Sequence, residues 1–268
     1  MSAYNALAPA DIGVTLTKTG IPYGTHPRQK LDVYVPDTSP SRNAVTAPMV
    51  VIFYGGSWNS GNKEDYGFLG KALASRGFVA VVADYRLVPE VRFPAFLDDG
   101  AAAVAWAHRN AQSLGGDPNQ LFLLGHSAGA YIAAMVALDK TYLNKAGSSP
   151  AIIKGVAALA GPYDFLPLDV DVAREAFGRT KNLAVTQPVN FATSRAPAMF
   201  LATGAADTTV QPRNTYALAE RLKQAGTTVV VRSYPQVTHV GLLLALSVPF
   251  RHQAPVLDDV SDFIRATR

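Results

Sequence analysis

The chain has 268 residues, of which 49% are hydrophobic, and this length and composition suit one domain with a substantial core. The formal net charge is +4, but the lysines and arginines are scattered and form no basic run, so nucleic acid is not expected as a partner. The absence of cysteine excludes disulfides, thiolate metal sites and a cysteine nucleophile.

The sequence contains no recognisable targeting or membrane segment. Residues 1–9 lack the cationic start and the apolar core of a signal peptide. A cytoplasmic location and export with the signal already removed are both compatible with this pattern. The most apolar late stretch, Val240 to Val248, is about half of the ~20 residues that a spanning helix needs, so no membrane span is expected.

Short apolar runs alternate with helical patterns, which is typical of βα units in a mostly parallel sheet. In chain order we expect strands at 13–18, 31–35 and 49–54, a helix at 65–75, a strand at 78–84, a helix at 95–112, a strand at 120–125, a helix at 128–139, strands at 153–160 and 197–203, a helix at 212–224, a strand at 228–234 and a helix at 256–266. The first two strands are expected to pair antiparallel at one edge. The predicted fold class is α/β, a single domain over 1–268 with an eight-stranded, mostly parallel sheet flanked by helices.

Residues 163–196 interrupt the alternation of strands and helices. They lie between two predicted strands, contain several prolines and carry one short helical pattern near Asp171 to Phe177. The segment is therefore longer than an ordinary connection. We predict that it forms a small cap beside the active site; a packing excursion without a substrate role is the alternative.

The pentapeptide Gly-His-Ser-Ala-Gly at 125–129 lies between an apolar run and an Ala-rich helical stretch. A sharp strand-to-helix turn exposes the serine at its tip, and small residues on both sides let the chain reverse without a clash. Ser127 is therefore the candidate nucleophile. The alternative is a glycine-rich turn in which the serine only caps the helix.

An acid and a base for Ser127 are expected in loops that follow later strands, because catalytic groups gather at the carboxyl ends of strands in an open α/β sheet. Asp207 and His239 occupy such loops. The order Ser, Asp, His is the one that accompanies a nucleophile elbow in this kind of sheet. His252 is the alternative base and Asp164 the alternative acid, whereas His108, in a helix before the elbow, is interpreted as structural, and His26 lies in an early polar loop.

Backbone donors for the oxygen that gains charge in acyl transfer are expected after the third strand. Gly55, Gly56 and Ser57 follow that strand, and the N–H of Ala128 after the nucleophile supplies a further donor. These four residues form the predicted oxyanion hole, with Gly56 and Ser57 as the favoured loop donors. Two neighbouring residues, Trp58 and His126, are candidate substrate-binding residues; a structural role is the alternative for His126.

With these motifs in place, the chain resembles the α/β-hydrolase superfamily, and within it the esterases related to hormone-sensitive lipase and the bacterial carboxylesterases and arylformamidases with a His-Gly-Gly-x-Trp oxyanion loop. The resemblance runs from about residue 30 to the C-terminus. It rests on Tyr54 to Trp58, on the Asp-Tyr-Arg-Leu-Val-Pro-Glu stretch at 84–90, on the elbow, and on the surroundings of Asp207 and His239.

One residue departs from this family pattern. Tyr54 stands where the family has the histidine at the head of the oxyanion loop. A phenol or another group must therefore hold the loop, and activity is expected to survive because backbone donors need no particular side chain. Asp84 and Arg86 are interpreted as a buried charge pair that braces neighbouring loops.

The residues and the resemblance together predict a serine carboxylic-ester hydrolase with the α/β-hydrolase fold, acting on small short-acyl or aryl esters through an acyl-enzyme. Hydrolysis of amides or formamides, as in arylformamidases or peptidases, uses the same residues and stays open as the alternative. A catalytically silent binding module is a third, less favoured hypothesis. The sequence contains no dinucleotide fingerprint, P-loop or His-rich cluster, so no cofactor and no metal are expected.

Overall fold

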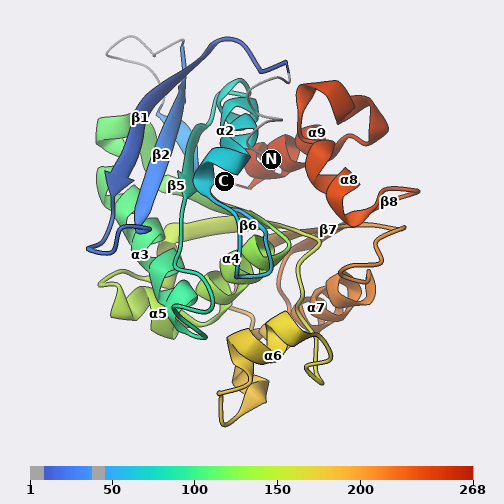
Figure 1. Ribbon diagram of the computed structural model, residues 1–268. Helices are drawn as coiled ribbons and strands as arrows, with labels where there is room; N and C mark the ends of the chain where they lie inside the picture. The colour runs from blue at the N-terminus through green and yellow to red at the C-terminus, as the bar shows by residue number, and fades with distance from the viewer. Residues whose placement is uncertain (1–8, 38–45, 268) are drawn as a thin grey trace.

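A computed structural model describes residues 9–37 and 46–267, and in these residues eight strands form a single sheet (Figure 1). The strands are β1 (Val14–Pro22), β2 (Lys30–Pro36), β3 (Ala47–Phe53), β4 (Val79–Ala83), β5 (Gly116–His126), β6 (Ile153–Leu159), β7 (Ala198–Gly204) and β8 (Val229–Tyr234). Their order across the sheet is β1-β2-β4-β3-β5-β6-β7-β8.

The strand directions confirm the predicted, mostly parallel sheet. β1 pairs antiparallel with β2 and β2 antiparallel with β4, whereas every pair from β4 to β8 is parallel. The central strands read as continuous apolar runs because both of their faces are covered; Met49 to Phe53 of β3, for example, have no exposed surface. The carboxyl ends of these parallel strands therefore meet at one edge of a rigid core.

The helices form two groups on the sheet. They are α2 (Gly67–Ala74), α3 (Ala95–Asn110), α4 (Ala128–Leu138), α5 (Lys140–Lys145), α6 (Asp171–Phe177), α7 (Arg213–Gln224), α8 (His239–Leu244) and α9 (Val256–Ala266). α2 contacts α9, and α3 contacts α4 and α5. In the view of Figure 1, α2, α8 and α9 lie above β6 and β7, while α4, α6 and α7 lie below them.

The structure adds two short helices to the predicted elements. α5 continues the chain directly after α4, and α8 begins at His239 itself. Each has only six residues, too few for a periodic apolar pattern to emerge. Residues 163–196 contain α6 and two 3₁₀ turns, at 183–186 and 188–191.

Two predictions concern the ends of the chain and membrane insertion. Residues 1–8, which the prediction of no signal peptide depends on, lie outside the described residues. In the described part of the chain, no helix is long and apolar enough to cross a bilayer.

Candidate active site

The backbone at Ser127 has the conformation of a sharp turn between β5 and α4. Its φ is +56° and its ψ −124°, and its N–H donates to the carbonyl of Leu159 at the end of β6 (2.9 Å). The flanking glycines fit because other backbone lies against them. A Cβ at Gly129 would lie 2.0 Å from the carbonyl oxygen of Phe53, and one at Gly125 would lie 2.2 Å from that of Gly129. Close backbone approach therefore requires glycine on both sides of the serine.

The structure brings Asp207 and His239 together. Asp207 follows β7, His239 opens α8, and Oδ2 of the aspartate accepts a hydrogen bond from Nδ1 of the histidine at 2.7 Å. Both residues are buried. The other carboxylate oxygen accepts the N–H groups of Thr209 and Val210, each at 2.9 Å. Burial alone would raise the pKa of Asp207, but the hydrogen bonds from His239 and these N–H groups outweigh it and lower the pKa, so the carboxylate stays ionised.

Backbone contacts fix the two loops that carry this pair. The N–H of Ala206 donates to the carbonyl of Val237 at 3.0 Å, and a Cβ at Gly204 would lie 2.1 Å from the same oxygen. The hydroxyl of Thr238 accepts the N–H of Gly241 and so caps α8. The acid and the base therefore sit on loops that are bonded to each other.

The alternative acid and base have other surroundings. His252 is exposed in a 3₁₀ segment at 248–253. The backbone of Asp164 bonds Asn214 and Arg213. In the described residues neither His252 nor Asp164 joins the Asp207–His239 pair. Nε2 of His26 lies 2.7 Å from a carboxylate oxygen of Glu90.

The oxyanion loop has an unusual run of left-handed backbone. Gly56, Ser57 and Trp58 have φ values of +123°, +51° and +60°. Within the described part of the chain, the N–H groups of Gly56, Ser57 and Ala128 have no hydrogen-bond acceptor, whereas the N–H of Gly55 donates to the hydroxyl of Tyr66 at 3.0 Å. Gly55 therefore differs from the predicted role: its donor is already used inside the protein, and three of the four predicted donors remain free for a ligand.

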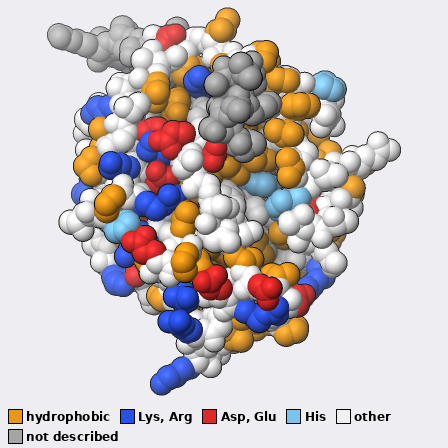
Figure 2. All heavy atoms as spheres, in the orientation of Figure 1, with side chains coloured by type: hydrophobic (Ala, Val, Ile, Leu, Met, Phe, Trp, Pro, Cys, Tyr) orange, Lys and Arg blue, Asp and Glu red, His pale blue; other side chains and the backbone are white. Residues whose placement is uncertain are grey.

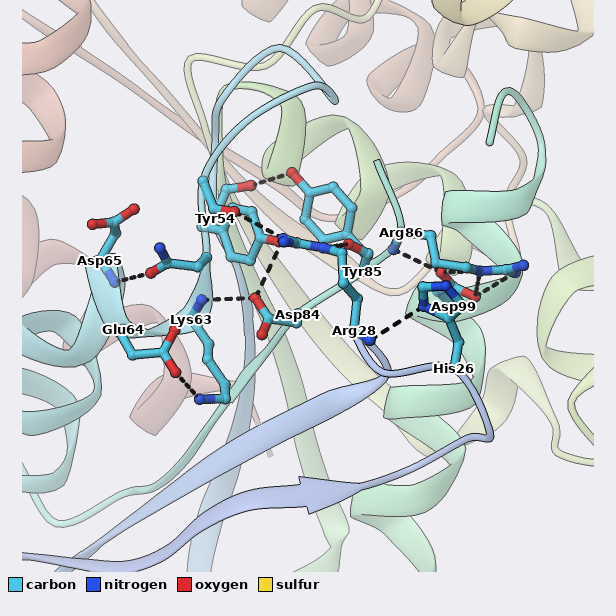
Figure 3. A network of polar contacts seen from close by, with 12 residues as sticks. His26, Arg28, Tyr54, Lys63, Glu64, Asp65, Asp84, Tyr85, Arg86 and Asp99 are labelled. Atoms are coloured by element: carbon cyan, nitrogen blue, oxygen red, sulfur yellow. Dashed lines mark hydrogen bonds and ion pairs between the residues drawn. The ribbon is translucent and has the colours of Figure 1, made fainter. Parts of the chain in front are cut away.

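The phenol of Tyr54 holds the head of the loop (Figure 3). Its hydroxyl accepts a hydrogen bond from Arg28 at 2.7 Å, and its carbonyl accepts one from the hydroxyl of Tyr85 at 2.9 Å. The rings of Tyr54 and Tyr85 stack with their centroids 4.5 Å apart. Arg28 also donates to the carbonyl of Gly61 at 2.8 Å, so one guanidinium fixes both ends of the loop.

Asp84 and Arg86 are not paired with each other, so their interpretation as one charge pair is wrong. Asp84 accepts the N–H of Lys63 at 2.8 Å and lies 3.7 Å from Arg28. Arg86 forms a bidentate ion pair with the buried Asp99, its shortest contact being 2.7 Å. Figure 3 shows the two charges in separate contacts that each brace a loop.

His126 lies behind the nucleophile. It is 4% exposed; its Nε2 lies 3.1 Å from the carbonyl oxygen of His239 and its Nδ1 3.1 Å from the hydroxyl of Tyr66. Burial, with the neighbouring His239 ring, lowers the pKa of His126 to about 3, so the ring is neutral at physiological pH. Both nitrogens are occupied inside the protein, which agrees with the structural alternative and not with direct substrate contact.

A cavity of about 400 Å³ opens over Ser127. Ser57, Trp58 and Ala128 line it beside the nucleophile. The rest of its lining comes from the predicted cap and from the segment after Asp207, namely Phe165, Asp169, Val170, Val172, Ala173, Thr208, Thr209, Val210, Gln211, Arg213 and Asn214, together with Pro162. Trp58, a predicted substrate-binding residue, lines the same cavity as Ser127.

The face of the molecule drawn in Figure 2 carries charges of both signs. In Figure 2, lysine and arginine side chains are interspersed with aspartate and glutamate side chains over the face shown. Among the described residues no group of three His, Cys, Asp or Glu side chains has the arrangement of a metal site.

Several residues of the site could not be recognised from the sequence. Tyr66 lies in a segment predicted as helix, and Arg28 lies in an early polar loop. Their roles depend on two contacts. Tyr66 accepts the N–H of Gly55, and Arg28 donates to the hydroxyl of Tyr54, which is distant from it in the chain. No local pattern marks such partners.

Comparison with known proteins gives a consistent picture. The family model described as BD-FAE matches residues 31–222. A probable isoprenylcysteine alpha-carbonyl methylesterase, ICMEL2 of Arabidopsis thaliana, is 28% identical over 248 residues, covering 85% of this chain and 58% of its own length. Kynurenine formamidase of Salmo salar is 31% identical over 173 residues, covering 65% of this chain and 55% of its own. The chain thus spans less than two thirds of the length of either relative.

A solved structure shares the fold across nearly the whole chain. A truncated carbohydrate esterase from gut microbiota superposes with a TM-score of 0.81 at 20% sequence identity, covering 97% of this chain and 99% of that one. At this level of identity the likeness concerns the fold.

Proposed function

The chain belongs to the BD-FAE family, and from that premise we propose that it is a serine carboxylic-ester hydrolase acting on small short-acyl or aryl esters. The observation that carries the proposal is the 2.7 Å hydrogen bond between Asp207 and His239, close to a serine held at φ +56° between a strand and a helix. The His239 ring lies 4.7 Å, centroid to centroid, from the ring of His126, the residue before that serine. Acyl transfer needs a nucleophile, a base and a group that orients the base.

In the proposed reaction, the hydroxyl oxygen of Ser127 attacks the ester carbonyl carbon while Nε2 of His239 takes the hydroxyl proton. Asp207 accepts the Nδ1–H of His239 and stabilises the imidazolium that forms. The carbonyl oxygen, now negative, receives hydrogen bonds from the free N–H groups of Gly56, Ser57 and Ala128.

Collapse of this intermediate breaks the bond to the alcohol oxygen, and the alcohol leaves with the proton from His239. Water then attacks the acyl-serine, again losing its proton to His239. The serine oxygen leaves with that proton, which releases the carboxylic acid and restores Ser127. Both half-reactions use side chains and backbone groups of the chain together with one water.

The size and walls of the cavity support the proposed substrate class. About 400 Å³ suits a small ligand, at the lower end of the range for drug-sized ones. Trp58, Phe165, Val172 and Ala173 offer an apolar surface near the nucleophile, as a short acyl chain or an aryl ring requires. Because residues of 163–196 form one wall, we propose that this segment acts as the cap that limits substrate length.

Hydrolysis of an amide or formamide is the second candidate, and the similarity to the kynurenine formamidase of Salmo salar favours it. The same three residues serve both bonds. Matched methyl esters and primary amides of the same acids separate the two, once each kcat/KM is divided by the uncatalysed rate. A larger enhancement for the ester is expected; a larger one for the amide would reassign the function. The third hypothesis, a silent binding module, has no need of an ionised acid aligned on a base.

A panel of p-nitrophenyl esters from acetate to laurate tests the proposal. We expect kcat/KM to be highest for the short acyl chains and to fall steeply for laurate. Ser127→Ala and His239→Ala should lower kcat at least ~10⁴-fold and Asp207→Asn about 10³- to 10⁴-fold, as in other triads.

The matched control for this panel is His252→Ala, which removes the other histidine that follows the acid in sequence and is exposed. It should retain wild-type activity. Full activity in Ser127→Ala would end the proposal, and loss in His252→Ala with retention in His239→Ala would reassign the base.

A further inference from the structure

A continuous chain of hydrogen bonds links the oxyanion loop to the base. The N–H of Gly55 donates to the hydroxyl oxygen of Tyr66 at 3.0 Å, and that hydroxyl lies 3.1 Å from Nδ1 of His126. On the other side of the ring, Nε2 of His126 lies 3.1 Å from the carbonyl oxygen of His239. Gly55 and His239 come from distant parts of the sequence; Gly55 lies against Ser127, and His239 lies against His126, the residue before it.

The direction of each bond in this chain is determined by the groups at its ends. The carbonyl of His239 can only accept, so Nε2 of His126 must carry a proton. In the neutral ring Nδ1 then accepts, and the hydroxyl of Tyr66 donates to it while its oxygen receives the N–H of Gly55. Every donor has one acceptor in this arrangement.

A charged His126 would break this pattern. Nδ1 would then also donate, and the proton of the Tyr66 hydroxyl would lose its acceptor in a buried position. The titratable groups that face His126 are Tyr66 from the 3₁₀ turn at 63–66 and His239 from α8, with Asp207 behind His239. Burial disfavours the charge on His126 more than Asp207 favours it.

Gly55 packs closely against His126 and Ser127. A Cβ placed on Gly55 would lie 3.2 Å from Nδ1 of His126 and 3.1 Å from Cβ of Ser127. The loop therefore rests directly on the elbow, and a shift of the His126 ring is transmitted to Gly55.

We infer that His126 is a positioning residue that sets the distance between the oxyanion loop and the base His239, through Tyr66 on one side and its own Nε2–H on the other. This inference rests on the proposed function of Ser127, His239 and the loop. Gly55, Tyr66, His126 and His239 are not among the residues that line the cavity at Ser127. Loss of the connection should therefore lower kcat much more than it raises KM, because the chemistry depends on alignment within a fraction of an ångström.

The test uses Tyr66→Phe, His126→Gln, His126→Leu and the double variant Tyr66→Phe/His126→Leu, assayed on p-nitrophenyl butyrate. Tyr66→Phe removes one hydroxyl and keeps the ring. Glutamine can keep a donor near the position of Nε2, whereas leucine keeps neither bond. The control is Tyr234→Phe, which removes the hydroxyl of an equally buried tyrosine, bonded to Asp259 of α9 and not to the site.

We expect Tyr66→Phe and His126→Leu to lower kcat about 10- to 100-fold with KM changed less than about threefold. His126→Gln should recover at least part of the activity that leucine loses. The kcat of the double variant should lie within about twofold of that of the less active single variant, because both substitutions interrupt the same chain of hydrogen bonds. Tyr234→Phe should keep the wild-type kcat.

Three results would overturn the inference. The first is an unchanged kcat in Tyr66→Phe; the second is a loss in the double variant equal to the product of the single losses. The third comes from ¹⁵N NMR of the histidine side chains in the unmodified protein, which needs no variant to fold: a protonated ring or a proton on Nδ1 of His126 at pH 6 contradicts the proposed directions. If NMR gives the neutral Nε2–H form while the wild type hydrolyses no ester, the proposed function fails and not the connection.

Discussion

Two residues around Ser127 are held in definite charge states by their surroundings. Asp207 keeps its charge because His239 and two N–H groups bond its oxygens, which outweighs the effect of burial on its pKa. His126 is kept neutral because burial opposes a charge there. In the proposed mechanism the ionised carboxylate orients His239, and the neutral imidazole of His126 bonds its two partners without adding positive charge beside the imidazolium of His239.

The pKa of His126 predicts a pH dependence of stability. Because its pKa in the folded protein is about 3 and that of an unfolded histidine is about 6.5, the unfolded chain binds a proton first as the pH falls. The stability contributed by this residue is present above pH 6.5 and is lost progressively between 6.5 and 3. Between pH 7.5 and 5 the loss should be on the order of 2 kcal/mol.

Urea unfolding of the wild type and of His126→Gln measures this loss. Glutamine does not titrate, so the difference in unfolding free energy between the two proteins should shrink by that amount as the pH falls from 7.5 to 5. Parallel curves over this range would show that His126 does not carry the predicted shift.

At the scale of elements, the oxyanion loop is built from backbone that ordinary residues rarely adopt. Gly56 has a φ of +123°, and its carbonyl accepts the N–H groups of Asn59 and Ser60. The two residues that follow are also left-handed without being glycine. Such strain persists only where surrounding contacts impose it, and Tyr54, Tyr66 and Arg28 supply those contacts.

Gly56→Ala should therefore disable the loop. The new Cβ would lie 2.3 Å from the carbonyl oxygen of Ser60, so the backbone that presents the free N–H groups must move. We expect kcat on p-nitrophenyl butyrate to fall at least ~100-fold, as when an oxyanion donor is removed. Gly77→Ala is the matched control, since Gly77 has a φ of +90° and no atom lies within 4 Å of the position that its Cβ would take. It should cost about 1 kcal/mol of stability and leave kcat unchanged; equal losses in both variants would contradict this account.

The sequence predicted the elements of the fold well because their patterns are local. All eight strands and the five longer helices lie within a few residues of their expected positions. The inner strands and these helices bury apolar residues, whereas the edge strand β1 is largely exposed. The elbow and the Asp207 and His239 loops were also recognisable, because each directly follows a predicted strand. The short helix α8 was not, although it carries the base, since six residues give too little periodicity.

Residues that act through distant contacts could not be assigned in the same way. Gly55 has the composition of an oxyanion donor, yet its N–H is used by Tyr66. Asp84 and Arg86 stand two residues apart but bind different partners, Arg28 and Asp99, which are far from each other in the sequence. Only the three-dimensional arrangement decides which of several local candidates are partners.

At the scale of the whole molecule, sheet topology assembles the site. Gly56, Ser127, Asp207 and His239 follow β3, β5, β7 and β8, and these strands are parallel, so their carboxyl ends lie along one edge. Residues 163–196 enter between β6 and β7 and contribute to the cavity over that edge. Four segments that are far apart in the sequence thus come to one edge of the sheet. The central claim is that Ser127, at this edge, is the nucleophile, and this claim can be tested directly.

The test is intact-protein mass spectrometry after brief incubation with a butyl phosphonate p-nitrophenyl ester, a reagent that transfers its phosphonyl group to an activated serine. The wild type should gain one phosphonyl group per chain, located at Ser127 by peptide mapping, with equimolar release of p-nitrophenol. Ser127→Ala should gain none, and His239→Ala should react at least ~10³-fold more slowly. Labelling of another residue, or equal labelling of Ser127→Ala, would contradict the claim that Ser127 is the nucleophile.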